Sequence, residues 1–207
     1  MKIIGNYNAQ QAHVATYLVS IGLLFPAFVL QMSTGKEYTQ GIDLTESFFV
    51  NVWLSQFAHL GWNHLLMNAA GLALITWGLA VEVRPRSWVI LTFLSLLATP
   101  FWLVWVEPLD WYCGLSGALH AQFTSLLIYA ISRSGTSWRR NWPLWLMMLG
   151  LVLKLGIEAL QEPEIDSLIG GTVAVQAHRA GTAFGLVFGL LAVRFNWLSA
   201  SHNQQHP

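Results

Sequence analysis

The sequence has few charged residues. Only 10% of its 207 residues are charged and 55% are hydrophobic, whereas a soluble domain typically contains about 25% charged residues. The chain therefore has too little polar surface to be coated by water, and we expect an integral membrane protein whose surroundings are the lipid bilayer. Lys plus Arg and Asp plus Glu number 10 each, so no basic excess indicates a nucleic-acid partner.

Cysteine is also scarce. Cys113 is the only one, which excludes an internal disulfide framework and any multi-cysteine metal site. As a lone thiol beside Gly114, it is most simply a small buried apolar side chain. The polar segment 199–207 contains His202 and His206 but no apolar periodicity. It is predicted to be a disordered cytoplasmic tail rather than a metal site, and no metal or cofactor is expected.

Long apolar runs make up most of the chain. A helix needs about 20 apolar residues to cross a hydrocarbon core about 30 Å thick. Six segments are candidates for such a span: roughly 13–32, 59–81, 88–106, 115–132, 142–160 and 174–194. No soluble domain or internal repeat interrupts them, so residues 1–198 are predicted to form one all-α, six-helix membrane domain. The first segment is interpreted as a retained span; the alternative is a cleaved signal peptide, but no small-x-small cleavage site follows it.

The positive charges indicate how the helices are oriented. Lys and Arg favour the cytoplasmic side of a membrane. The connections after the second and fourth spans and both chain ends contain most of the bases: Lys2, Arg84, Arg86, Arg133, Arg139, Arg140 and Arg194. The opposite connections contain Lys36 as their only base. Both termini are therefore predicted to be cytoplasmic, which puts the polar residues of the second, fourth and sixth spans near the outer face.

The second span begins with a cluster of polar side chains. His64 and Asn68 are four residues apart and share one face of a helix, and His59 lies at or just before the helix start. Two such donors side by side suit an anion that forms transiently. The alternative is a polar contact between helices, which contributes little in a membrane.

The fourth span begins with a serine between glycines, Gly114-Leu115-Ser116-Gly117. Glycine lets another backbone or a substrate approach closely, and the N–H of Ser116 is free because it lies in the first helical turn. The alternative is a small-residue packing face with a helix-terminal serine. His120 shares the face of Ser116 and is interpreted as a packing or orienting group rather than a base.

The sixth span contains a histidine on a face of small residues. These recur every four positions: Ala177, Gly181, Gly185 and Gly189. The pattern lets transmembrane helices pack backbone to backbone, and Gly117 of the fourth span is the expected partner. Such packing would bring His178 to Ser116, where an imidazole within about 2.6–3.2 Å of the hydroxyl could act as a general base. A simple packing role for His178 is the alternative.

Three further charges lie inside predicted spans: Lys154, Glu158 and Arg179. Ionisable groups at that depth are candidates for function, for example as a charge pathway in a transporter. The simpler interpretation is a structural ion pair that joins the fifth and sixth spans. Lys154 and Glu158 are four residues apart, and Glu158 is predicted to face Arg179.

Together these motifs resemble those of the rhomboid family of intramembrane serine proteases. The resemblance rests on His-x4-His-x3-Asn (His59, His64, Asn68), Gly-x-Ser-Gly (Gly114 to Gly117) and Ala-His-x2-Gly-x3-Gly (Ala177, His178, Gly181, Gly185). It implies that Ser116 is the nucleophile and His178 the base, a dyad without a carboxylate. It also implies an oxyanion hole formed by the N–H of Ser116 with His64 and Asn68, while His59 helps to hold the site or its water.

Two departures from the family pattern point to a subgroup. Many rhomboids have a tyrosine four residues after the serine, packed on the catalytic histidine, where this chain has His120. The family's Trp-Arg element is not evident between Ser33 and Ala58. Both features are similar to rhombosortases of the bacterial inner membrane, which implies periplasmic removal of Gly-Gly-containing C-terminal anchor tails from exported, membrane-anchored proteins. A general rhomboid protease and an inactive client-binding relative are the alternatives.

Overall fold

The computed structural model describes residues 2–34, 42–45, 47–135, 138–160, 165–166 and 171–199. In these ranges the helices are α1 (Lys2–Thr34), α2 (Phe48–Phe57), α3 (Trp62–Gly78), the 3-10 turn η1 (Ala80–Glu82), α4 (Pro85–Trp105), α5 (Ser116–Arg133), α6 (Trp138–Leu160) and α7 (Val175–Phe195). The strands are β1 (Ile42–Asp43), β2 (Trp111–Tyr112), β3 (Ile165–Asp166) and β4 (Gly171–Thr172). Lys36 and the predicted tail from residue 200 onward lie outside the described residues.

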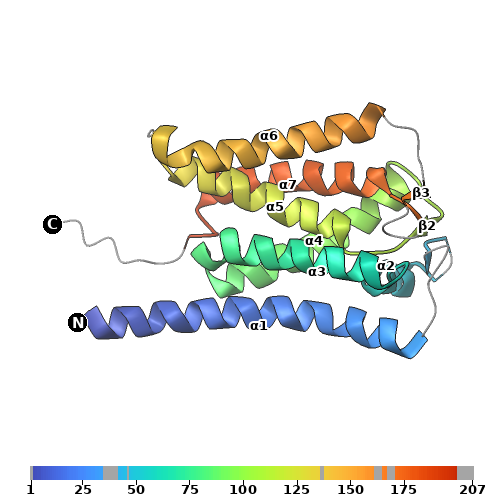
Figure 1. Cartoon of the computed structure of the whole chain (residues 1–207), viewed down its shortest axis with the longest axis horizontal. Coiled ribbons are helices and arrows are strands. Elements are labelled where there is room, and N and C mark those ends of the chain that lie inside the picture. Colours follow the sequence, from blue (N-terminus) through green and yellow to red (C-terminus); the bar gives the residue numbers. More distant parts are fainter. Residues whose placement is uncertain are drawn as a thin grey trace.

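The long helices lie side by side along one axis (Figure 1). They are α1, α3, α4, α5, α6 and α7, and each overlaps one predicted span, with α1 beginning well before its span. The segment before the second span forms α2. In this view α1 lies along one edge, α6 along the other, and α4, α5 and α7 lie between them. The start of α1 and the end of α7 are at one end of the bundle, and the strands are at the other.

The centre of the bundle is the contact between α5 and α7, where the two backbones touch. A Cβ added at Gly181 would collide with the carbonyl oxygen of Gly117. One added at Gly185 would lie 2.7 Å from the carbonyl oxygen of Ala121. The hydroxyl of Ser125 donates to the carbonyl of Gly185 at 3.1 Å. The predicted packing of the small-residue face of the sixth span against Gly117 is confirmed. Only glycine, which has no Cβ atom, permits so close a contact between the two backbones.

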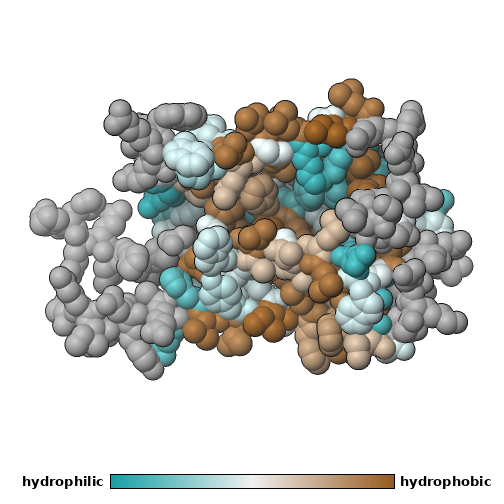
Figure 2. Space-filling model, viewed as in Figure 1, coloured by the Kyte–Doolittle hydropathy of each residue, from teal (hydrophilic) through white to brown (hydrophobic). Residues whose placement is uncertain are grey.

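Much of the face of the bundle drawn in Figure 2 is apolar (brown), with smaller hydrophilic areas (teal) between. On α6 the exposed side chains include Leu146, Leu149, Val152, Leu153 and Ile157. In water, so many exposed large hydrophobic side chains would promote association. In a bilayer they face lipid, so the described surface is that of a membrane protein.

Three helices are long and apolar enough to cross a membrane within the described residues, with spans at His13–Ser33, Pro85–Trp105 and Asn141–Leu160. The other three predicted spans form helices whose inward faces contain polar residues; α3, for example, has 17 residues and buries His64 and Asn68. The number of six crossings therefore stays a prediction.

Short strand pairs fix the loops at the end of the bundle opposite the chain termini. β1 pairs antiparallel with β2, with Ile42 opposite Tyr112. The N–H of Gly114 then donates to the carbonyl of Ser55 at the end of α2, at 2.8 Å. These bonds anchor the segment that leads into α5, and therefore determine where its first residue, Ser116, lies.

Candidate active site

Ser116 is the first residue of α5, at the wall of a cavity of about 1070 Å³. Gly114 precedes it with φ at +104°, in the left-handed region that favours glycine. Because the first N–H groups of a helix have no acceptor within the helix, the N–H of Ser116 is available to a ligand. The cavity has both an apolar wall and polar groups, as substrate sites do.

Tyr112 was not among the predicted site residues. Its phenolic oxygen accepts a hydrogen bond from the N–H of Gly117 at 3.3 Å. The tyrosine is 2% exposed, and burial raises the pKa of its hydroxyl well above the ordinary value. The phenol therefore stays protonated and holds the first turn of α5. The sequence signal for it is weak, because a tyrosine in a loop is common.

His64 and Asn68 converge on the backbone of Gly114. A Cβ at Gly114 would lie 2.7 Å from Nε2 of His64 and 3.2 Å from Nδ2 of Asn68. The Nδ1 of His64 accepts a long hydrogen bond, 3.4 Å, from the N–H of Leu60. In the neutral ring Nε2 must then hold the proton. The imidazole thus presents a donor at the edge that faces Gly114, two residues before the serine.

Asn68 adds a second donor beside the first. Its Nδ2 is buried and has no hydrogen-bond partner among the described residues. Leaving a buried donor without a partner costs free energy, so this group is suited to bind an acceptor that enters the cavity. The predicted face shared by His64 and Asn68 is confirmed, since both line the cavity with Ser116.

His59 supports this pair from behind. Its Nδ1 lies 3.0 Å from the carbonyl oxygen of Phe57, to which it donates. Its ring lies edge-on to that of His64, with centroids 4.9 Å apart and planes at 69°. His59 is 1% exposed. It therefore contacts the side chain of His64 rather than the cavity.

His178 reaches the same cavity from the first turns of α7. Gly181, three residues after His178, packs against Gly117. The backbone contact of α5 with α7 therefore holds His178 beside the start of α5. His120 lies flat on its ring, with centroids 4.2 Å apart and planes at 19°. The Nδ1 of His120 donates to the carbonyl oxygen of Ser116 at 2.7 Å, so the predicted packing role of His120 fits its contacts.

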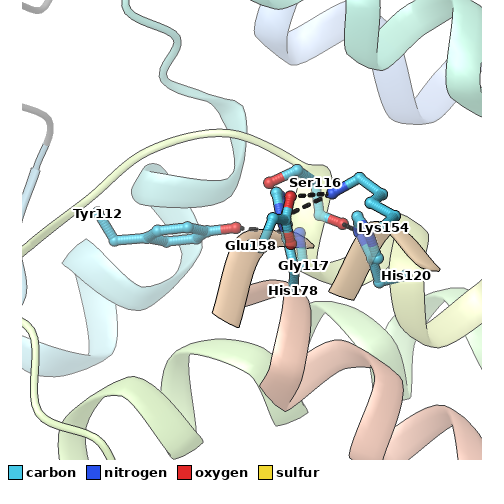
Figure 3. A network of polar contacts seen from close by, with 7 residues as sticks. All are labelled: Tyr112, Ser116, Gly117, His120, Lys154, Glu158 and His178. Atoms are coloured by element: carbon cyan, nitrogen blue, oxygen red, sulfur yellow. Dashed lines mark hydrogen bonds and ion pairs between the residues drawn. The ribbon is translucent and has the colours of Figure 1, made fainter. Parts of the chain in front are cut away.

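The charged side chains of α6 complete the group (Figure 3). Nδ1 of His178 lies 2.9 Å from Oε1 of Glu158 and 3.0 Å from Nζ of Lys154. The predicted pairing of Lys154 with Glu158 is confirmed. The predicted pairing of Glu158 with Arg179 is wrong: Arg179 binds Glu107 at 2.8 Å instead. Successive residues of a helix point in directions about 100° apart, so Arg179 cannot face the partner of His178.

Cys113 lies next to the site without a polar role. It is half-buried at the cavity wall, and burial raises the pKa of its thiol to about 12. A thiol that stays protonated at neutral pH is a poor nucleophile. The expectation of an apolar structural role agrees with this environment.

The fold and this cavity together define a class of protein. It is a helical membrane protein in which a serine, an imidazole and two side-chain hydrogen-bond donors surround one cavity near one end of the helical bundle. The Rhomboid domain model matches residues 47–195. The match covers more than half of the chain, which therefore belongs to the rhomboid family, a family of intramembrane serine proteases. None of the curated proteins compared with the chain matches it.

Proposed function

We propose that this protein is an intramembrane serine endopeptidase in which Ser116 is the nucleophile and His178 the general base. The observation that supports this most strongly is the convergence of Ser116, His178, His64 and Asn68 on one cavity. These residues come from three helices that are far apart in the sequence. A polar packing contact would not require a cavity, whereas a substrate does.

The proposed reaction is ordinary acyl transfer. The hydroxyl of Ser116 attacks the scissile carbonyl while the imidazole of His178 takes its proton and later returns it to the leaving amine. The oxyanion binds the N–H of Ser116, Nε2–H of His64 and Nδ2–H of Asn68. Water then hydrolyses the acyl-enzyme and regenerates the serine.

The charges support a site near the outer face of the membrane. The N–H of Arg84 donates to the carbonyl oxygen of Leu198, and Tyr129 binds Asn196, so the start of α4 and the ends of α5 and α7 lie together. Arg84, Arg133 and Arg194 are therefore at the end of the bundle remote from the cavity. By the positive-inside rule that end is cytoplasmic. We place the termini there, in a multi-pass inner-membrane protein with a periplasmic site.

A fluorophosphonate probe tests the activity. We expect labelling of the detergent-solubilised protein that is absent in Ser116→Ala and reduced to background in His178→Ala. Labelling that persists in both variants would refute the protease. A wild-type protein that folds but does not label would favour an inactive, client-binding relative.

The finer proposal is that the protein is a rhombosortase. It is supported by His120 in place of tyrosine, stacked on His178, and by the absence of an evident Trp-Arg element in the sequence between Ser33 and Ala58. Substrates would be exported proteins anchored by a C-terminal transmembrane tail. The test is co-expression with an exported reporter that ends in a Gly-Gly segment, an apolar helix and basic residues. If a second reporter whose tail lacks the glycines is cleaved as well, the result would instead favour a general rhomboid protease.

A further inference from the structure

The Nδ1 atom of His178 has two charged neighbours, both from α6. The carboxylate of Glu158 places Oε1 at 2.9 Å and Oε2 at 3.0 Å from it. The ammonium of Lys154 lies at 3.0 Å and is itself paired with Oε1 of Glu158. His178 is 6% exposed. Nδ1 can donate to the carboxylate or accept from the ammonium, and it cannot do both.

The geometry distinguishes these two states. If Lys154 donated to Nδ1, the lone pair of that nitrogen would be engaged, and no proton would separate Nδ1 from two carboxylate oxygens within 3.0 Å. An ionised carboxylate is only an acceptor, so those contacts would be repulsive. With the proton on Nδ1, both donors point at Glu158 and both carboxylate contacts are attractive. The contact of Nδ1–H with the ammonium at 3.0 Å is then the single unfavourable one, against two in the alternative state. The pairing of Lys154 with Glu158 leaves Lys154 satisfied in either case.

We infer that Glu158 is a positioning residue that holds His178 as the Nδ1–H tautomer, with Nε2 free to take a proton. This inference rests on the proposed function, because it assigns a role only if His178 is the base. The arrangement has the logic of a serine–histidine–carboxylate triad, in which the carboxylate orients the imidazole and stabilises its protonated form. The carboxylate comes from α6, a helix that contributes neither the nucleophile nor the base.

The α6 charges are thus not equivalent, although they form one ion pair. The side chain of Glu158 is 16% exposed and that of Lys154 is 44% exposed. Lys154 neutralises a carboxylate at the cavity wall, a contact that contributes little at an exposed position. A purely structural pair would make the loss of either partner equally harmful. The positioning role makes the loss of Glu158 more harmful than the loss of Lys154.

The tautomer can be measured without activity. Long-range ¹H–¹⁵N NMR of histidine-labelled protein in detergent distinguishes Nδ1–H from Nε2–H rings, and His178→Ala assigns the signal. We expect Nδ1–H in the wild type and in Lys154→Met. In Glu158→Met the remaining ammonium donates to Nδ1, and the proton moves to Nε2. A wild-type Nε2–H ring, or an unchanged ring in Glu158→Met, would overturn the inference.

The same variants are then compared by the rate of fluorophosphonate labelling per folded molecule. Glu158→Met should lose about 10²–10⁴ in rate, the contribution of a general base, and this loss should clearly exceed that of Lys154→Met. Glu107→Met is the matched control, because it removes the carboxylate that binds Arg179 and leaves His178 untouched. Equal losses in Glu158→Met and Lys154→Met would refute positioning. A wild-type protein that is not labelled would refute the proposed protease activity. The NMR measurement would still show which tautomer His178 adopts, and so would test the inference separately.

Discussion

The ring of His120 lies 4.2 Å from that of His178, nearly parallel to it. His120 is fixed in turn by the carbonyl of Ser116, one helical turn earlier. The stack therefore connects the first turn of α5 to the side chain of α7 that we propose as the base. It restricts the rotation of His178 about its side-chain bonds, while the α6 charges contact the Nδ1 edge of the same ring.

A planar residue at position 120 should preserve this stack. We expect His120→Phe to label with fluorophosphonate within a few-fold of wild type, while His120→Ala falls by about 2- to 10-fold, the usual contribution of one aromatic contact. The comparison is the labelling rate per folded molecule. Equal rates in His120→Ala and wild type would contradict an orienting role.

The donors that face Gly114 should act on the transition state rather than on folding. Asn68→Ala removes the free Nδ2 donor, and the loss of one oxyanion donor typically costs about 10²–10³ in rate. We expect that reduction in cleavage rate with an unchanged melting temperature, because Nδ2 has no partner to lose among the described residues. A melting temperature that falls along with the rate would instead indicate a packing role for Asn68.

Two glycine variants test the close contact of α5 with α7. Gly181→Ala drives a methyl group into the carbonyl oxygen of Gly117, and overpacking typically costs about 1–3 kcal/mol. We expect a melting temperature lower by about 2–12 °C and little labelling. Gly156→Ala on α6 is the control, since nothing lies within 4 Å of its added Cβ. Similar melting temperatures for the two variants would show that the helices can separate freely.

Cys113 should resist alkylation. With a thiol pKa raised by burial to about 12, the reactive thiolate at pH 8 is roughly 10³-fold rarer than for an ordinary exposed thiol. Its reaction with iodoacetamide should be slow at pH 8 and should accelerate about tenfold per pH unit toward pH 12. The same chain unfolded in detergent should react at the ordinary rate. Fast alkylation of the folded protein at pH 8 would contradict a buried thiol.

The sequence by itself determined the helices and the grouping of residues within each of them. Apolar runs of sufficient length located the six long helices, since such runs are stable only away from water. Spacings of three and four residues put His64 with Asn68, and Gly181 with Gly185, because the helix period is fixed by the backbone. The small-residue pattern even identified Gly117 as the partner of α7, since few helices can approach that closely.

Only the tertiary structure decided which charged side chains meet. The sequence placed Lys154 and Glu158 on one face of α6 but did not specify which residue of α7 that face meets, and Glu158 was expected opposite Arg179 rather than His178. A turn of about 100° between neighbouring residues separates those partners. Tyr112 was unforeseen because the strand pair and the bond from Gly114 to Ser55 determine its position. Periodicity describes one helix at a time, whereas the rotation of a helix and the path of a loop depend on packing against the rest of the chain.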